Sequence, residues 1–192
     1  ESNFQLNDLF VLDMANNHQG DVEHGLAIIS GVGEVVGRHG VRAAVKFQFR
    51  QLDSFIHKDH HEGSDNKHIP RFISTRLDRK QYQTMLDRIR AEGMHAICTP
   101  FDEQSVDVIE DMGFDAIKIA SCSASDWPLI EKIADANMPV IFSTGGTTLK
   151  EIDDLVSFFD HRGVNYGIMH CVSIYPTPDE LCHLNQIELI RQ

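Results

Sequence analysis

Two lysines stand inside runs of apolar residues, where a charged side chain is costly to bury. Lys46 follows Val45, and Lys118 lies between two isoleucines. A buried lysine is tolerated when an anion or a carboxylate lies beside it. The two lysines therefore predict a pocket for a phosphate or carboxylate group. Two alternatives stay open from the residues alone: an internal salt bridge, with Asp13 as the obvious partner, and a Schiff base with a carbonyl substrate.

Hydroxyl side chains follow similar apolar runs and could donate hydrogen bonds to the same anion. The segment Ser143-Thr144-Gly145-Gly146, which precedes an expected helix, resembles a small anion-binding turn. His170 also ends an apolar run, where it could be a metal ligand, an acid-base group or a histidine satisfied by neighbouring hydrogen bonds. The hydroxyl residues at these ends are Thr99, Ser121, Ser143 and Ser173.

These polar residues lie at the ends of six short apolar runs, which we interpret as parallel β-strands. A strand that is buried on both faces reads as a nearly continuous apolar run. Gly or Asn precedes most of the runs by a few residues, as expected where a helix ends in a left-handed cap. The runs are Leu9–Asp13, Ala43–Gln48, Ala96–Thr99, Ala116–Ser121, Val140–Ser143 and Tyr166–His170, and the cap residues are Gly40, Gly93, Gly113, Asn137 and Gly163.

Helical patterns alternate with these runs, which predicts an α/β fold with parallel strands. Asp21 is a good N-cap for a first helix that runs to Arg38. Six strands could form an open doubly wound sheet or three quarters of an eight-stranded barrel. No glycine-rich dinucleotide fingerprint follows the first strand, which favours the barrel, whose active site lies at the carboxyl ends of the strands. Further helices are expected over about residues 78–92, 103–112, 129–136 and 149–161, and from near Asn185.

A long polar stretch, Arg50–Thr75, follows the second run and contains His57, His60 and His61. Connections of this length are usually functional lids or are disordered. We expect this stretch to be a lid over the carboxyl ends of the strands, with its histidines in solvent.

Composition restricts the class of protein. The 192 residues suffice for one domain with a sizeable core, and a net charge of −12 argues against nucleic acid or an anionic membrane as the main partner. No apolar segment is long enough to span a membrane, and there is no signal-peptide pattern at the N-terminus. The four cysteines form no CxxC pair, which favours reduced thiols in a cytoplasmic protein. Cys122 or Cys171 could be a nucleophile, although space-filling is the commoner role for such a residue.

Six ordered motifs resemble the sialic acid synthase family, which includes the spore coat polysaccharide biosynthesis synthases. The resemblance runs from the first strand to the end of the chain. The motifs are Asn17-His18-Gln19-Gly20, Val45-Lys46-Phe47-Gln48, Thr99-Pro100-Phe101-Asp102, Ile117-Lys118-Ile119-Ala120-Ser121, Phe142-Ser143-Thr144-Gly145 and His170-Cys171-Val172-Ser173-Ile174-Tyr175-Pro176-Thr177-Pro178.

The resemblance implies a TIM-type (β/α)8 barrel, of which this chain carries about the first six β/α units, as one synthase-type domain over residues 1–192. It implies condensation of phosphoenolpyruvate with an amino sugar or related aldose, which releases phosphate and forms a nonulosonic acid for surface polysaccharide. A divalent metal, Mn²⁺ or Mg²⁺, would polarise the sugar aldehyde. Catalytic roles fall on Asp13 and Lys118. Substrate-binding roles fall on Lys46, Gln48, Thr99, Lys118, Ser121, Ser143, Ser173 and Tyr175.

Three residues depart from the family pattern. Ser123 stands where sialic acid synthases proper carry a Glu that helps to activate the reacting groups, which resembles the spore-coat branch instead. Asp13 stands where the family usually has Glu, and Ser173 stands where it often has Asn. The identity of the sugar acceptor therefore does not follow from the resemblance.

The chain also stops before strands 7 and 8, which in the family supply the two histidines that bind the metal. We therefore expect a C-terminally incomplete domain with no metal ligands of its own and no turnover by these 192 residues alone. Unpaired strand edges invite association, so a homodimer is compatible with the sequence. Two alternatives remain: a barrel aldolase or lyase that uses Lys46 or Lys118 as a Schiff base, and a degenerate binding or assembly module.

Overall fold

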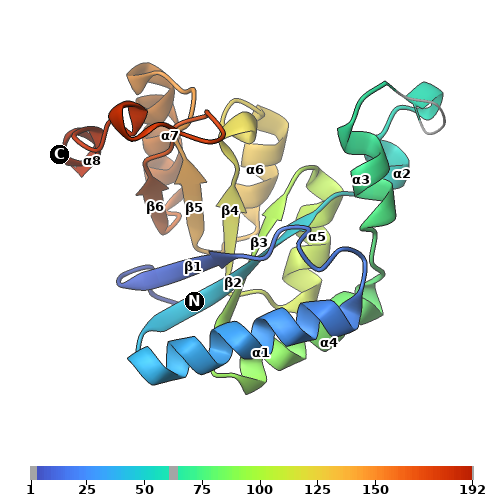
Figure 1. The fold of residues 1–192 in the computed structure, drawn as a ribbon. Helices are drawn as coiled ribbons and strands as arrows, with labels where there is room; N and C mark the ends of the chain where they lie inside the picture. Colours follow the sequence, from blue (N-terminus) through green and yellow to red (C-terminus); the bar gives the residue numbers. More distant parts are fainter. Residues whose placement is uncertain (1–3, 61–64, 192) are drawn as a thin grey trace. The chain divides into compact units, whose positions relative to one another are not determined.

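The computed structural model describes residues 4–60 and 65–191 (Figure 1). The chain divides into two compact units, residues 7–114 and residues 1–6 with 115–192, which are described separately. Both are built from parallel strands that alternate with helices, as the sequence predicts. None of the helices in the described residues is both long and apolar enough to cross a membrane.

The unit of residues 7–114 is a parallel three-stranded sheet with its helices. Asp13 pairs in register with Lys46, and Gln48 pairs with Thr99. Helices α1 and α4 lie side by side, and α5 packs on β3 (Figure 1). The elements are β1 (Leu9–Asp13), α1 (Val22–His39), β2 (Arg42–Phe49), α2 (Leu52–Phe55), α3 (His68–Ser74), α4 (Arg79–Ala91), β3 (His95–Pro100) and α5 (Glu103–Met112), with a 3-10 turn at Lys58–His60.

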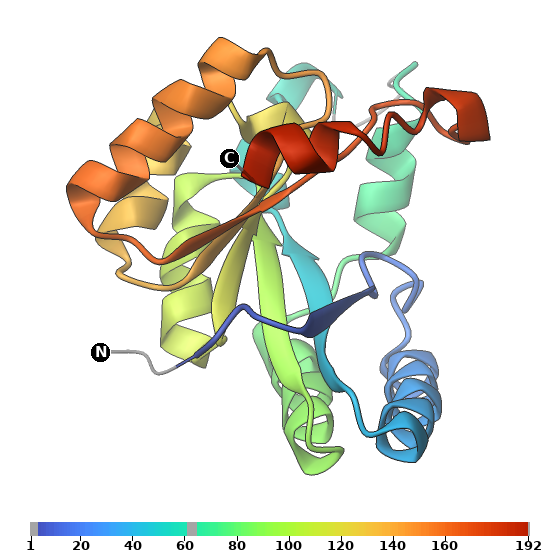
Figure 2. The ribbon, with the colours of Figure 1, turned by 90° about the vertical axis from the view of Figure 1, so that its left-hand side faces the viewer.

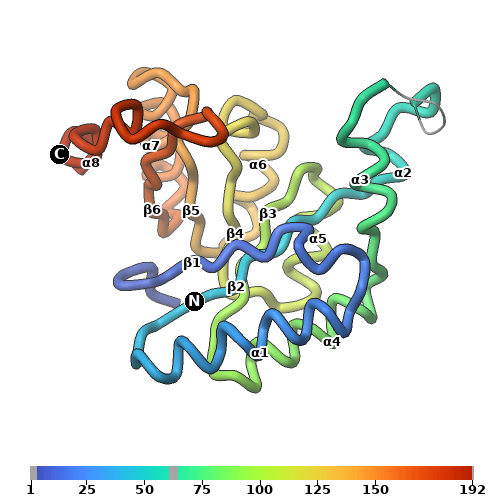
Figure 3. Tube along the Cα trace, viewed as in Figure 1, coloured from blue at the N-terminus to red at the C-terminus, as the bar shows by residue number. Residues whose placement is uncertain are grey.

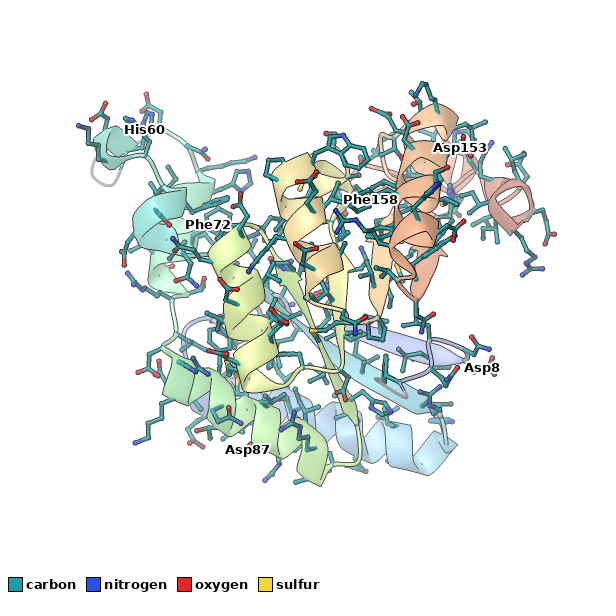
Figure 4. All side chains as sticks on the ribbon, turned by 180° about the vertical axis from the view of Figure 1, so that it is seen from behind. Asp8, His60, Phe72, Asp87, Asp153 and Phe158 are labelled. Atoms are coloured by element: carbon teal, nitrogen blue, oxygen red, sulfur yellow. The ribbon has the colours of Figure 1, made fainter. Side chains whose placement is uncertain are left out.

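The unit that contains residues 115–192 has a second set of three parallel strands, β4, β5 and β6, paired in chain order. Helix α6 connects β4 to β5, and helix α7 connects β5 to β6 (Figure 2). Phe158 on α7 packs edge-on against Trp127 at the start of α6, with 5.5 Å between the ring centroids (Figure 4). The elements are β4 (Ala116–Ile119), α6 (Trp127–Asp135), β5 (Val140–Ser143), α7 (Leu149–Arg162), β6 (Tyr166–Met169) and α8 (Gln186–Arg191), with 3-10 turns at Ser121–Ser123 and Asp179–Leu181.

The predicted strands are all present, but their burial differs. Strands β2 to β5 are almost wholly buried, which explains their continuous apolar runs. Strand β1 is not buried on both faces, because Phe10 is 60% exposed, and β6 is half-buried throughout.

The predicted helix ends are confirmed by backbone conformation. Gly113 and Gly163 end α5 and α7 in the left-handed region, with φ of 71° and 66°. Asn137, which follows α6, has φ of 51°. Side chains tolerate this region poorly except for Asn and Asp, so these residue types place the turn that returns the chain to the next strand. Gly40 and Gly93 have the same conformation.

The described parts of the Arg50–Thr75 stretch contain more regular structure than the long polar loop that the sequence predicts. It contains two short helices, α2 and α3, near the carboxyl ends of β2 and β3 (Figure 3). Arg76, directly after this stretch, forms a bidentate ion pair with Asp53 of α2 at 2.9 and 2.8 Å. Helices this short carry no apolar periodicity, which is why the sequence pattern did not reveal them. His57 is exposed, as expected, while His61 lies outside the described residues.

Helix α4 begins in a capping box, which gives a direct test of local stability. The Asp78 carboxylate accepts a bond from the Gln81 backbone at 2.8 Å, and the Gln81 side chain accepts one from the Asp78 backbone at 2.8 Å. We expect Asp78→Ala to lower the free energy of unfolding by about 1 kcal/mol in urea denaturation. Asp87→Ala removes a carboxylate from the interior of the same helix and should cost less than about 0.5 kcal/mol. Equal losses in the two variants would contradict the cap.

Candidate functional site

Lys118 lies at the centre of a polar cluster at the carboxyl ends of β4, β5 and β6. The residue is 7% exposed. Its ammonium group donates to the Ile119 carbonyl at 3.0 Å and to the Ser143 hydroxyl. The Ser143 hydroxyl also accepts a bond from the Cys171 thiol at 3.2 Å. Both of these contacts join the buried ammonium group to neutral oxygen atoms.

Gly145 brings two further hydroxyls to the same cluster. Its backbone N–H donates to Ser121 Oγ at 3.0 Å. A β-carbon at Gly145 would lie 2.9 Å from Ser121 Oγ and 2.5 Å from Ser173 Oγ. Both hydroxyls therefore rest on the turn after β5 at a distance that only glycine permits. The structure thus groups Lys118, Ser121, Ser143 and Ser173, four of the predicted binding residues, around this one turn.

The neighbouring residues hold the turn in place. Thr144 N–H donates to the Met169 carbonyl at 3.1 Å, and the Thr144 hydroxyl accepts from Cys171 N–H at 3.3 Å. His170 Nε2 lies 2.8 Å from the Cys182 carbonyl, so the ring donates to a backbone acceptor. Of the interpretations left open for His170, the structure favours a histidine satisfied by its hydrogen bond.

Tyr175 and the cysteines differ in their relation to this cluster. Tyr175 is 94% exposed, and its predicted role in substrate binding stays a prediction. All four cysteines are free, and Cys171 is the one that joins the cluster. Burial raises the pKa of the Cys98 thiol in the other unit well above its usual value, so it is protonated at neutral pH.

In the unit of residues 7–114, Lys46 forms the internal salt bridge that the sequence left as an alternative. Its Nζ lies 2.9 Å from Asp13 Oδ1. The lysine side chain is 9% exposed, whereas that of Asp13 is 57% exposed. The pair satisfies the buried charge through one carboxylate oxygen. The predicted role of Lys46 in binding a substrate anion stays a prediction.

Gln48 and Thr99, the other predicted binding residues of this unit, lie in register on adjacent strands. Thr99 is 1% exposed, and its hydroxyl has no hydrogen-bond partner among the described residues. Such a group usually has an explanation, and a ligand or water is one of them. Gln48 Oε1 accepts two bonds from the Arg50 guanidinium, each 3.2 Å long. Sequence reasoning missed Arg50, which directly follows β2 and whose contacts depend on the fold.

A cavity of about 500 Å³ adjoins these residues. Its lining combines cationic, amide and aromatic side chains, a mixture that suits a polar ligand. Burial raises the pKa of Tyr82, one of the lining residues, so its hydroxyl stays protonated. Lining residues include Gln48, Arg50, Phe72, Arg76, Tyr82 and Met112.

His18, from one of the sequence motifs, is fully buried. Its Nδ1 accepts a bond from Gly20 N–H at 3.1 Å, and its ring packs edge-on against Tyr82. Its Nε2 is buried and has no partner among the described residues. Burial, with a smaller contribution from His24, lowers the pKa of His18 below 6.5. The motif residue is therefore a neutral histidine that fixes the β1–α1 loop.

This lowered pKa predicts a pH dependence of stability. Above pH 6.5 His18 is neutral in the folded and unfolded states alike, so its contribution is complete. Below pH 6.5 the unfolded chain takes up a proton that the folded chain resists, so the free energy of unfolding falls. We expect His18→Gln to reduce this loss in urea titrations between about pH 7.5 and pH 5.5. The exposed His68 is the control, and an equal effect of His68→Gln would contradict the assignment.

The donor set does not itself form a metal site. Within residues 4–60 and 65–191, no group of three His, Cys, Asp or Glu side chains is placed to hold a metal ion. Structural and catalytic zinc sites take three or four such ligands from a protein. We therefore assign no step to a metal held by these residues.

Comparison with known proteins decides the family. The NeuB family model matches residues 37–192. This chain belongs to the NeuB family. A solved structure of a protein named spore coat polysaccharide biosynthesis protein E, from Chromobacterium violaceum, is 49% identical and superposes with a TM-score of 0.93 over 97% of this chain. That match covers 55% of the other protein.

Two other NeuB relatives are more distant. Spore coat polysaccharide biosynthesis protein SpsE of Bacillus subtilis is 30% identical over 91% of this chain and 47% of its own length. N-acetylneuraminate-9-phosphate synthase of Drosophila melanogaster is 28% identical over 94% of this chain and 50% of its own length. The chain thus spans about half the length of the relatives it matches. Its six β/α units and these similarities confirm the predicted TIM-type β/α fold.

Proposed function

We propose that this NeuB chain is the phosphoenolpyruvate-binding part of a condensing synthase that makes a sialic-acid-like nonulosonic acid for surface polysaccharide. The observation that carries the proposal is the cluster at the ends of β4, β5 and β6. There a buried ammonium group and hydroxyls from Ser121, Ser143 and Ser173 surround a glycine turn. A dianionic phosphate or carboxylate is the ligand that such a set of donors fits.

The roles within the cluster follow from its contacts. Lys118 supplies the positive charge, because its ammonium group is buried and its contact with Ser143 fixes it in place. The hydroxyls donate to oxygen atoms of the ligand, and they can reorient because a hydroxyl both donates and accepts. Gly145 contributes space: without a β-carbon, the ligand can approach the turn closely.

The relatives support the reaction class. Relatives that are named for an activity include synthases of N-acetylneuraminate 9-phosphate, N,N'-diacetyllegionaminic acid and pseudaminic acid. We propose an amino sugar or related aldose as the acceptor for the whole protein. A divalent metal, a homodimer and a cytoplasmic location are also parts of the proposal that concern the whole protein. Ser123, which is buried beside the cluster, is the residue we expect to mark the spore-coat branch.

Calorimetry with three ligands tests the proposal. We expect phosphoenolpyruvate to bind more tightly than inorganic phosphate, and phosphate more tightly than pyruvate, because the donors suit two anionic groups at once. Repeating the titration with Mn²⁺ separates metal-dependent binding from binding by these residues. Absence of any heat with phosphoenolpyruvate, with and without Mn²⁺, would favour a degenerate module instead.

A chemical trap distinguishes the Schiff-base alternative from the proposed synthase. Treatment with pyruvate and sodium borohydride adds a stable mass to an enzyme that forms an imine with lysine. We expect no such adduct, since the Lys118 ammonium group is engaged with a hydroxyl and a carbonyl as a hydrogen-bond donor. An adduct on Lys118 or Lys46 in the peptide map would favour an aldolase or lyase over the proposed synthase.

A further inference from the structure

We propose that Arg50 is a positioning residue that fixes the polarity of the Gln48 side-chain amide, so that Gln48 can only donate hydrogen bonds to a ligand. Gln48 is one of the residues predicted to bind substrate, and the inference rests on the proposed function in that respect. Arg50 has no role in the resemblance described above. Its assignment comes from its contacts with Gln48, Phe72 and Phe101.

The chemistry of arginine settles which way the amide faces. Both terminal nitrogens of Arg50 lie 3.2 Å from Gln48 Oε1. A guanidinium group has donors only, so the atom that it contacts must be the amide oxygen and not the amide nitrogen. The amide nitrogen, Nε2, then diverges from Arg50. No described residue accepts a bond from it.

Arg50 itself contacts two aromatic rings. Its guanidinium carbon lies 3.7 Å from the ring centroid of Phe101, which follows β3, and 4.3 Å from that of Phe72 on α3 (Figure 4 labels Phe72). Cation–π contacts with two aromatic rings restrict the position of the guanidinium group. A planar fork that is restricted in this way holds one amide oxygen in one place. The α3 helix of the Arg50–Thr75 stretch is therefore linked to Gln48 through Arg50.

The surroundings of Gln48 present donors as well. Lys46 and Gln48 are two residues apart and so lie on the same face of β2, where Lys46 is paired with Asp13. The register places Thr99 beside Gln48. The nearby Asp102 carboxylate is already used by the backbone N–H groups of Gln51 and Ser105, each at 2.8 Å. An amide NH₂, a hydroxyl and an ammonium group together favour a ligand rich in acceptor oxygens. Arg50 makes the amide part of this donor set.

A double-mutant cycle tests whether Arg50 acts through Gln48. The probe is phosphoenolpyruvate, and affinity is measured by calorimetry. We expect Arg50→Met to lower affinity about fivefold, the usual effect of one hydrogen bond. Gln48→Met should lower it by at least as much, and the double variant should be no weaker than Gln48→Met. Arg50→Lys should restore part of the loss, because an ammonium group still donates to Oε1. Arg71→Met, at an exposed arginine of α3, is the charge control.

Three outcomes would overturn the inference while leaving the proposed function intact: wild-type affinity in Arg50→Met, additive losses in the double variant, or a loss in Arg71→Met equal to that in Arg50→Met. A second readout does not depend on the ligand. In ¹⁵N-labelled protein, the Gln48 side-chain NH₂ resonances, assigned by their loss in Gln48→Met, should move toward those of exposed glutamines in Arg50→Met. Unmoved resonances overturn the positioning role even if phosphoenolpyruvate fails to bind. If Arg50→Met does not fold, Arg50→Lys carries the same test, with a smaller shift expected.

Discussion

Replacing Lys118 by Met is expected to remove phosphoenolpyruvate binding while the fold remains. Lys118 is the buried cation of the cluster in residues 115–192, and it already donates to Ser143 and to the Ile119 carbonyl. A hydrogen bond from a charged group contributes roughly 3 kcal/mol at most, which corresponds to about a 100-fold change in affinity. Met has a similar length and no charge, so it fills most of the space of the lysine side chain. The expected measurement is a calorimetric titration without detectable heat, together with an unchanged circular dichroism spectrum.

A matched control separates the charge of Lys118 from the net charge of the protein. Lys150→Met removes one positive charge from the same unit, at an α7 side chain that is 81% exposed and pairs with Asp154. We expect this variant to bind phosphoenolpyruvate as the wild type does. Retained affinity in Lys118→Met, or an equal loss in Lys150→Met, would show that the cluster is not the anion site. Retained affinity in Lys118→Met would also favour Lys46 as the main cation of the anion site.

The strands and most helix boundaries were predictable because their signals are local. Apolar runs gave β2 to β5, since strands buried on both faces need apolar side chains at nearly every position. Asp21, Asp78 and Thr148 each cap a helix through their own side chains, and Gly113 ends one through its backbone. The burial of β1 was not predictable in this way, because it depends on which neighbours cover the strand.

The site was predictable in part, and the missed residues have a common reason. The hydroxyls around Gly145 were found because each follows an apolar run at a strand end. Arg50 was missed because its role depends on Phe72 and Phe101, which are distant in sequence and meet only in the fold. His18 was assigned to a motif, but its burial and lowered pKa come from packing against Tyr82 and the helix beside it. Contacts of this kind have no signal in a single sequence.

Gly145→Ala is expected to weaken phosphoenolpyruvate binding about 30-fold, an effect of about 2 kcal/mol, which is typical of overpacking by one methyl group. The new β-carbon would lie 2.5 Å from Ser173 Oγ and 2.9 Å from Ser121 Oγ, closer than van der Waals contact allows. The two hydroxyls must then move away from the turn. The Ser121 hydroxyl would also lose its bond from the Gly145 N–H at 3.0 Å, so two of the four proposed ligand contacts change together.

The control for this variant is an alanine at a glycine with open space around it. Gly37 in α1 has no atom within 4 Å of the position of an added β-carbon, so Gly37→Ala should leave binding unchanged and raise the free energy of unfolding by about 0.5–1 kcal/mol. In Gly145→Ala, Ser173→Gly removes the closest clash and should recover part of the lost affinity, even though it deletes one proposed donor. Such a recovery is expected only if crowding of the hydroxyls, and not the alanine backbone, causes the loss. Wild-type affinity in Gly145→Ala would mean that the ligand does not bind at the turn after β5, because no anion could reach these hydroxyls while they make room for a methyl group.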